Sequence, residues 1–238
     1  MTGDVLIPFE HEWIPARWVR RYKRFLIDVE LETGEIITAH CPDPGRMTTA
    51  GGPGCRVWLT YHDDPRRKLA HTLQLVEVEG TLVLVNNAWA NRLVLEALRR
   101  DLIPELTGYT SIRPEMRLEE GTRLDFLLEK DQGRCWLEVK SVTLVQDGIA
   151  AFPDAVTKRG VRHLEALAER VQAGERGVLL FLLQREDAQS FRPADEVDPA
   201  YGEALRAAMK AGVEVLIYQA RIGLEGLGWG RPLPWTQE

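Results

Sequence analysis

The 238-residue sequence lacks the features of a secreted or membrane-embedded chain. Its first stretch, MTGDVLIPFEHEW, carries acidic residues where a signal peptide needs a basic start and a long apolar segment. The longest apolar run, VLLFLL at residues 178–183, is far shorter than the roughly 20 residues that cross a bilayer. These absences predict a cytoplasmic protein.

Cysteine is also scarce, and the chain has no excess of positive charge. Cys41, Cys55 and Cys135 are odd in number and have no CxxC spacing, which favours neither a disulfide framework nor a zinc ribbon. The formal net charge is -6, so any binding of nucleic acid depends on local basic patches. The length is sufficient for one large or two small domains.

The part of the chain up to residue 87 has the pattern of short strands divided by turns. RFLIDVEL, IITAH, CRVWLTYH, HTLQLVEVEG and TLVLVNN are separated by segments rich in glycine and proline. Phe25, Ile27 and Val29 alternate and are predicted to face a core. The spacing predicts a small barrel or sandwich over residues 1–87, and a five-stranded OB-like barrel fits the length.

From residue 88 onward, helical and strand patterns alternate. AWANRLVLEALRRDLI has leucines at helical spacing, and RLDFLLE with CWLEVKSVTLV predicts a hairpin. A helix is expected over 154–172, capped by Asp154, and another after Asp198-Pro199. GVLLFLLQ is apolar on both faces, as is typical of an interior parallel strand. The sequence thus predicts a mixed α/β protein, with a layered α/β domain over residues 88–238.

Two charged residues interrupt the apolar segment CWLEVKSV. Glu138 and Lys140 point to one face of a strand, and antiparallel pairing can bring Asp125 beside Glu138. Two such carboxylates repel unless a proton, a lysine or a divalent cation intervenes. Oxygen ligands suit Mg²⁺ or Mn²⁺, and a nearby lysine can activate water or stabilise phosphate charge. The pattern indicates metal-assisted phosphodiester hydrolysis; the alternative is a buried structural ion pair between Glu138 and Lys140.

The spacing D-x12-E-x-K of Asp125, Glu138 and Lys140 resembles the PD-(D/E)xK nuclease superfamily, with Leu124 in place of the proline. In this interpretation Asp125 and Glu138 hold the metal, and Lys140 positions or activates the attacking water.

The helix predicted after this hairpin supplies two more candidate catalytic residues. Arg159 and His163 are four residues apart and therefore share a face. We expect Arg159 to hold a phosphate through two donors, because a guanidinium can bind bidentately. His163 is either a proton carrier or a solvated helix residue.

A basic segment predicts contact with nucleic acid. RWVRRYKRF at 17–25 has five basic residues, no acid and interleaved aromatic residues, which is how OB-type folds hold single strands. The alternative is a solvated strand face. Glu96 is expected to be an ordinary helix surface residue. The residues expected to contact nucleic acid are Arg20, Arg21, Lys23, Arg24, Arg46, Asn91 and Arg159.

Four stretches resemble the sugar fermentation stimulation protein A family: RYKRFL, HCPDPGRM, VNNAWANRL and FPDAVTKRGVRHLEAL. They occur in the family's order, and the resemblance runs from about residue 17 to residue 220. It implies an N-terminal OB fold, a C-terminal PD-(D/E)xK nuclease-like domain and DNA binding. The family usually has Asn-Thr where this chain has Asp43-Pro44, and its name records a genetic effect rather than sugar chemistry.

These observations predict a DNA-binding protein with a Mg²⁺ or Mn²⁺ site able to hydrolyse phosphodiesters. The alternative is a non-enzymatic, DNA-binding transcriptional regulator that keeps a nuclease-like fold. A third interpretation is an α/β protein in which the Glu138–Lys140 pair is structural and neither metal nor nucleic acid binds.

Overall fold

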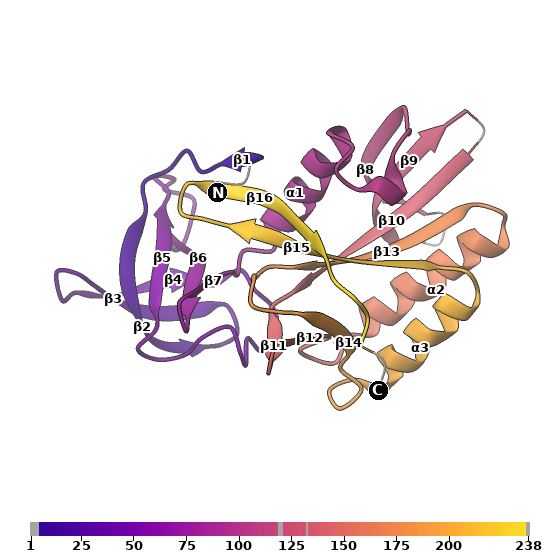
Figure 1. The fold of residues 1–238 in the computed structure, drawn as a ribbon. Coiled ribbons are helices and arrows are strands. Elements are labelled where there is room, and N and C mark those ends of the chain that lie inside the picture. Colours follow the sequence, from indigo (N-terminus) through magenta and orange to yellow (C-terminus); the bar gives the residue numbers. More distant parts are fainter. Residues whose placement is uncertain (1–4, 119–120, 132, 237–238) are drawn as a thin grey trace.

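The computed structural model describes residues 5–118, 121–131 and 133–236. A β-barrel formed by the N-terminal part of the chain lies beside an α/β unit formed by the rest (Figure 1). No helix in these ranges is long and apolar enough to span a membrane.

Six strands form the barrel sheet, in the order β4-β3-β2-β5-β6-β7. A parallel bridge from His40 to Thr72 pairs β4 with β6 and closes the first five strands, and β7 extends the sheet beyond β6. Ile27, Val29 and Leu59 are fully buried inside. The predicted five-stranded OB-like barrel is therefore confirmed. The six strands of the sheet are β2 Ile14–Tyr22, β3 Leu26–Leu31, β4 Ile36–His40, β5 Arg56–Tyr61, β6 His71–Val78 and β7 Thr81–Leu84.

Phe25 does not lie in the barrel core, so that prediction was wrong. A tight turn joins β2 to β3, with φ values of 48° at Lys23 and 67° at Arg24, and Phe25 follows within the turn. Its side chain is 44% exposed and stacks on the ring of His40 at 6.5 Å. The inward alternation starts at Ile27, because a turn residue does not follow the two-residue period of a strand.

The α/β unit is built on a seven-stranded sheet in the order β1-β16-β15-β13-β10-β9-β8. β13 is parallel to both neighbours, and β9 with β10 forms the predicted antiparallel hairpin. β1 pairs with β16, so this N-terminal strand joins the C-terminal sheet, whereas the sequence-based division placed it with the barrel. The strands are β1 Ile7–Pro8, β8 Ser111–Arg117, β9 Arg123–Lys130, β10 Gly133–Val142, β13 Arg176–Leu183, β15 Glu214–Ile222 and β16 Gly226–Pro232.

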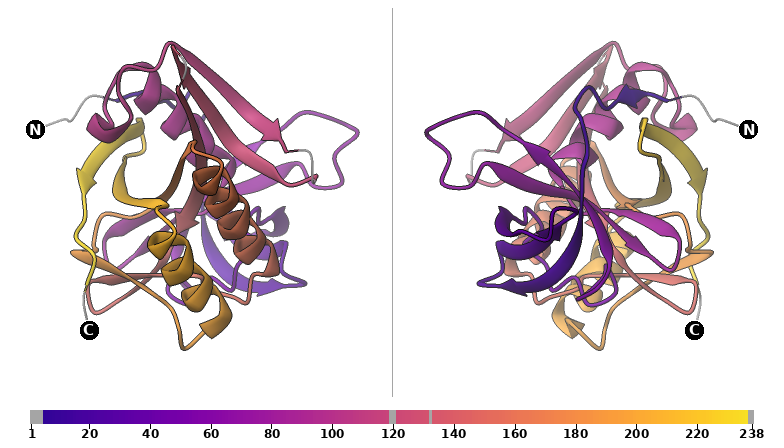
Figure 2. Two further views of the ribbon diagram at one scale, coloured as in Figure 1. Left: turned by 90° about the vertical axis from the view of Figure 1, so that its right-hand side faces the viewer. Right: turned by 90° about the vertical axis from the view of Figure 1, so that its left-hand side faces the viewer.

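Helices cover both faces of this sheet, with α2 and α3 side by side (Figure 2). Leu180 and Leu182 of β13 belong to the core beneath α1. Phe181 and Leu183 belong to the core beneath α2 and α3. The apolar run of this strand is continuous because both of its faces are covered. The remaining elements are α1 Ala88–Arg99, a 3-10 turn Pro104–Leu106, β11 Leu144–Gln146, β12 Ile149–Phe152, α2 Lys158–Gln172, β14 Ser190–Pro193 and α3 Pro199–Lys210.

The N-terminal caps of α2 and α3 were predicted with different success. Asp198 caps α3 as expected, with its side chain accepting a hydrogen bond from the backbone N–H of Tyr201. The cap of α2 is Thr157, which accepts from the N–H of Gly160 at 3.0 Å. Asp154 therefore does not cap α2, which begins four residues later than expected and leaves Asp154 in the preceding loop.

A buried arginine joins the barrel to the α/β unit. Arg185 is 3% exposed and donates through Nη1 to the carbonyl of Thr49, in the loop after β4, at 2.7 Å. The same nitrogen donates to the carbonyl of Thr143 at 3.0 Å, and Nε and Nη2 bind Asp187. Its hydrogen bonds thus fix the loop of one unit to a strand end of the other.

Replacement of Arg185 by alanine is expected to lower the free energy of unfolding by about 3 kcal/mol, because two carbonyls and a carboxylate lose a buried donor. Arg66 offers a matched control, since it also binds an aspartate two residues away through two donors but lies at the surface. Arg66→Ala is expected to cost less than about 1 kcal/mol. Urea unfolding measures both, and equal losses would contradict the role assigned to Arg185.

Candidate metal and nucleic-acid site

The two carboxylates predicted to bind metal lie where β9 and β10 separate. The ladder pairs these strands as far as Leu137 opposite Phe126. Glu138 and Asp125 come next in this register, so the antiparallel hairpin brings them to neighbouring positions. The structure therefore places both carboxylates together, at the end of the paired region.

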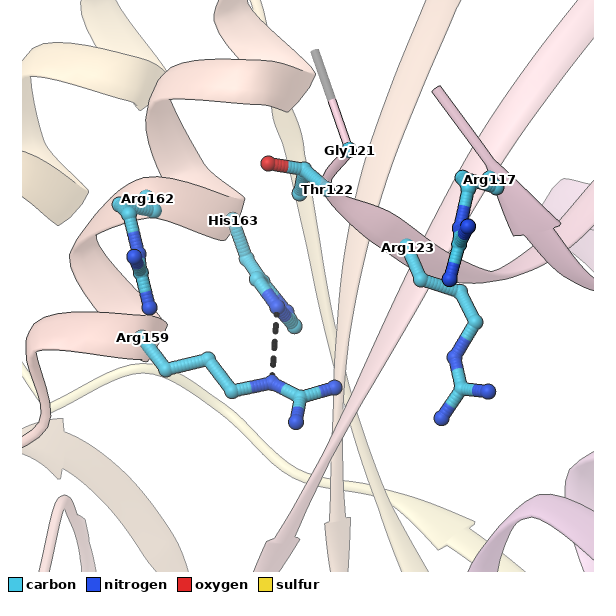
Figure 3. Close-up of a pocket in the computed structure, with 7 residues that line it drawn as sticks. All are labelled: Arg117, Gly121, Thr122, Arg123, Arg159, Arg162 and His163. Atoms are coloured by element: carbon cyan, nitrogen blue, oxygen red, sulfur yellow. Dashed lines mark hydrogen bonds between the residues drawn. The ribbon is translucent and has the colours of Figure 1, made fainter. Parts of the chain in front are cut away.

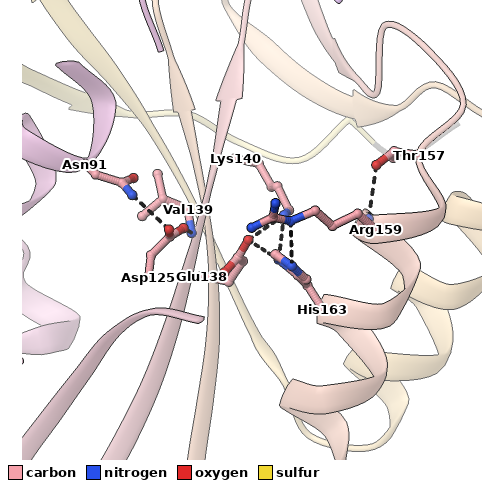
Figure 4. A network of polar contacts seen from close by, with 9 residues as sticks. Asn91, Asp125, Glu138, Val139, Lys140, Thr157, Arg159 and His163 are labelled. Atoms are coloured by element: carbon pink, nitrogen blue, oxygen red, sulfur yellow. Dashed lines mark hydrogen bonds and ion pairs between the residues drawn. The ribbon is translucent and has the colours of Figure 1, made fainter. Parts of the chain in front are cut away.

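Asp125 is held by two hydrogen bonds (Figure 4). Its Oδ2 accepts from the backbone N–H of Val139 at 2.9 Å, and its Oδ1 accepts from Nδ2 of Asn91 on α1 at 2.8 Å. Burial and the charge of Glu138 raise the pKa of Asp125 to about 6. Asn91, which is expected to contact nucleic acid, orients this carboxylate through its hydrogen bond. Glu96 forms surface ion pairs with arginines of its own helix, as expected of a helix surface residue.

Glu138 is 2% exposed, and the side chains of Lys140 and His163 contact its carboxylate. Its Oε1 accepts from Nζ of Lys140 at 2.5 Å and contacts Nδ1 of His163. Burial raises the pKa of Glu138, but Lys140 and His163 outweigh burial and hold this pKa below its usual value. Its Oε2 is buried and has no hydrogen-bond partner among the described residues.

His163 links this carboxylate to helix α2. It is 4% exposed, so the interpretation as a solvated helix residue was wrong. Its Nε2 accepts a hydrogen bond from Nε of Arg159 at 3.1 Å, which places the ring proton on Nδ1, facing Glu138. Arg159 and His163 thus share a face, as predicted, and together they orient Glu138.

Four arginines line a cavity of about 560 Å³ next to His163, and we call it the arginine pocket (Figure 3). It is formed by the end of β8, the start of β9 and the first turns of α2. Arg117 pairs with Arg123 across β8 and β9, which brings their guanidinium groups to one wall. The complete lining is Arg117, Gly121, Thr122, Arg123, Arg159, Arg162 and His163.

Sequence reasoning missed three of these arginines. Arg162 lies three residues after Arg159 and therefore on a neighbouring face of the helix, a spacing that could have indicated it. Arg117 and Arg123 are found together only through the strand register. They form a concentrated basic patch in a chain whose net charge is negative.

The basic residues predicted to contact nucleic acid differ in their partners within the protein. Arg20 pairs with Asp28 at 2.7 Å, and Arg21 donates to carbonyls of the loop after β4, so both have partners within the barrel. Lys23 and Arg24 lie in the β2–β3 turn, and Arg46 is exposed. Arg24 alone of these five lines a cavity next to Lys140.

This interdomain cavity, of about 320 Å³, lies between the barrel and the α/β unit. Lys140 belongs to its lining, so the predicted catalytic lysine is reached from the barrel side. Its wall is completed by Arg24, residues 43–45, Asn87 and residues 139–144 and 151–157.

A close pair of carboxylates lines this cavity, with Asp43 from the loop after β4 and Asp154 from the loop before α2. Asp43 is 4% exposed and accepts from the N–H of Gly45 at 2.7 Å. Asp154 accepts from the N–H of Met47 at 3.2 Å, and a Cβ on Gly45 would collide with its carboxylate. Burial, with a contribution from Asp154, raises the pKa of Asp43 to about 6.

The raised pKa of Asp43 makes stability depend on pH. Between about pH 4 and pH 6 the folded protein binds more protons at this group than the unfolded chain does, so stability falls as the pH rises through this window. Asp43→Asn removes the charge while its oxygen can still accept from Gly45. At pH 7 the variant is expected to be more stable by about 2 kcal/mol.

Urea unfolding of the protein and of Asp43→Asn at several pH values tests this expectation. The stability difference should grow from about pH 4 to pH 6 and then stay level. Asp63→Asn, which removes an exposed carboxylate of the barrel, is the control. A difference that does not change with pH would show that the Asp43 charge is not the cause.

Two family models match the chain. The model described as "Sugar fermentation stimulation protein RE domain" matches residues 88–226, and the model described as "SfsA N-terminal OB domain" matches residues 19–85. The chain belongs to the sugar fermentation stimulation protein family. The confirmed barrel corresponds to the OB part of this family, and the mixed α/β unit to its second part.

Relatives of the family resemble the chain over nearly its whole length. A sugar fermentation stimulation protein homolog of Pseudomonas paraeruginosa is 52% identical, and the alignment covers 92% of this chain and 95% of the relative. A homolog of Geobacter metallireducens is 49% identical with the same coverage. The structure of Pyrococcus furiosus SfsA in complex with Ca²⁺ is 26% identical, covers 98% of this chain and 100% of that chain, and has a TM-score of 0.88.

Proposed function

We propose that this family member binds DNA and that Asp125 and Glu138 hold a divalent cation with which it hydrolyses phosphodiesters. One observation carries the proposal: the unpartnered, buried Oε2 of Glu138 lies in a site that adjoins the arginine pocket. His163 connects the two, because it contacts Glu138 and also lines that pocket. A buried carboxylate oxygen without a donor requires a compensating partner.

The donors present suit Mg²⁺ or Mn²⁺. No group of three His, Cys, Asp or Glu side chains that could hold a metal occurs in the described part of the chain. Two carboxylates leave most of the ligand shell to water and to phosphate oxygens, which is how Mg²⁺ is commonly bound. The related structure from Pyrococcus furiosus contains Ca²⁺, another cation that takes oxygen ligands. Such a cation supplies a Lewis acid at the phosphate.

The side chains around the two carboxylates have distinct roles in this proposal. Asn91 and the N–H of Val139 fix Asp125, while His163 fixes Glu138. Lys140 lies beside Glu138 and reaches the interdomain cavity, where its ammonium can stabilise charge that develops on a phosphate. The arginine pocket binds neighbouring phosphates through bidentate donors.

A second candidate function is DNA binding without cleavage. Its support is that Oε1 of Glu138 already faces both Lys140 and His163, so the network holds a counter-charge without a metal. In this alternative the carboxylates stabilise the fold and the arginine pocket alone contacts DNA, as in a transcriptional regulator.

Cleavage distinguishes the two functions. Labelled single- and double-stranded DNA is incubated with the protein and Mg²⁺ or Mn²⁺, beside Asp125→Ala and Lys140→Ala. Each variant is expected to lose at least about 100-fold in cleavage rate while Lys140→Ala still binds DNA, because the lysine acts on the reacting phosphate. Lys210→Ala, on the exposed end of α3, is the control. Binding without cleavage in both metals would favour the regulator.

Salt dependence tests the arginine pocket independently of cleavage. The affinity falls as salt rises, and each phosphate contact that is lost reduces the steepness of log K against log salt by about 1. Arg123→Ala and Arg162→Ala are therefore each expected to weaken binding and to reduce this slope. Arg206→Ala, on α3, removes the same charge from a pair with Asp195 and should leave the slope unchanged. Slopes equal to that of the unaltered protein would exclude the pocket as the phosphate site.

A further inference from the structure

A cavity of about 510 Å³ lies at the junction of the barrel with α1. None of the residues assigned to catalysis above lines it. We call it the ring cavity. Three of the five histidines of the chain, His11, His40 and His62, line it. Its described lining has no Asp or Glu, although the protein contains 36 acidic residues. A cavity without carboxylates does not repel a polyanion.

The floor of the ring cavity is a fixed polar network. Gln74 is 4% exposed, and its Nε2 donates to Oγ1 of Thr60 at 2.9 Å. Its Oε1 accepts from Nδ2 of Asn86 at 2.8 Å and from Nε1 of Trp89 at 3.0 Å. The amide therefore holds the Trp89 ring in one orientation and ties α1 to the barrel, so the cavity is formed before any ligand binds.

Aromatic and cationic groups form the rim. Tyr61 is 55% exposed at the end of β5, with the ring of His71 5.3 Å away. The guanidinium of Arg92 lies 4.3 Å from the centre of the Trp89 ring. Arg67 donates to Oγ1 of Thr72 at 3.0 Å. Within the part of the chain that the structure describes, neither arginine forms an ion pair, so both charges are available to an anion.

The ring cavity lies next to the interdomain cavity beside Lys140. Two backbone segments separate the cavities, and consecutive residues of each segment line them in turn. Pro42 lines the ring cavity and Asp43 the interdomain cavity. Asn86 and Ala88 line the ring cavity, whereas Asn87 between them lines the interdomain cavity. The two cavities therefore lie on either side of the same backbone segments, one residue apart in the chain.

We propose that the ring cavity binds an unpaired base of a DNA single strand whose backbone continues into the interdomain cavity. Flat rings offer stacking surfaces to a base, and Arg67 and Arg92 offer donors to the adjoining phosphates. Bases of a duplex are paired and stacked on each other, and so cannot reach these rings. The inference rests on the proposed function in taking DNA as the ligand, and it adds that the bound strand is single.

Fluorescence anisotropy without divalent cations tests the ring cavity, because the probe is then not cleaved. Three labelled probes are compared: an oligothymidine of about 12 nucleotides, within the site size of one OB fold, an abasic strand of equal length, and a duplex. Tyr61→Ala is expected to bind oligothymidine about ten-fold more weakly, since base–aromatic stacking is lost. It should bind the abasic strand and the duplex as the unaltered protein does.

Matched variants separate stacking and charge from general damage. Tyr61→Phe keeps the ring and should bind as the unaltered protein does. Ile36→Ala truncates an exposed side chain elsewhere on the barrel and should have no effect. Arg67→Ala should weaken binding to both the oligothymidine and the abasic strand. Arg56→Ala removes the same charge at the opposite end of β5, in a cavity that contains Glu30 and Glu32, and should not.

The outcomes that overturn the ring cavity differ from those that overturn DNA binding. If Tyr61→Ala leaves oligothymidine binding unchanged while Arg162→Ala weakens it, DNA binding stands and the ring cavity is not a base site. An equal loss on oligothymidine, abasic strand and duplex also overturns base stacking. If the unaltered protein binds none of the three probes, both the proposed function and this inference fail.

Discussion

The buried carboxylate of Glu138 is the constraint on which the arrangement of the α/β unit depends. A charge in the middle of a sheet is stable only with partners, and those partners come from separate elements. Lys140 is on the same strand and His163 is on α2. Arg159 donates a hydrogen bond to the ring nitrogen of His163 that points away from Glu138. The position of α2 over the sheet is therefore fixed by polar contacts as well as by its apolar face, and the arginine pocket opens at the same place.

The barrel is attached so that its loops complete this site. Arg185 and Asp154 fix the loop after β4 against the strand ends of the α/β unit, and this loop forms one wall of the interdomain cavity. Lys140 is thus reached from the barrel, while His163 is reached from the arginine pocket. The site lies between two surfaces of different chemistry, one rich in guanidinium groups and one that carries both acidic and basic side chains.

Local patterns in the sequence were sufficient for much of the fold. The apolar run of β13 indicated a strand covered on both faces, and Asp198-Pro199 indicated the start of α3. The D-x12-E-x-K spacing joined Asp125 to Glu138 because a hairpin has only one register that keeps its apolar faces aligned. Each of these features depends on neighbours along the chain or on one adjacent strand.

The sequence by itself determined the two-part architecture, the strand and helix periods and the carboxylate pair, since local propensity and burial decide them. Only the tertiary structure decided which charged side chains lie together. Arg20 and Arg21 found partners inside the barrel, Asp154 bonded across the interface, and Arg117 and Arg123 met through strand pairing. A charged side chain is equally well solvated at many surface positions, so its sequence neighbourhood does not specify its partner. That choice follows from contacts between segments distant in the chain.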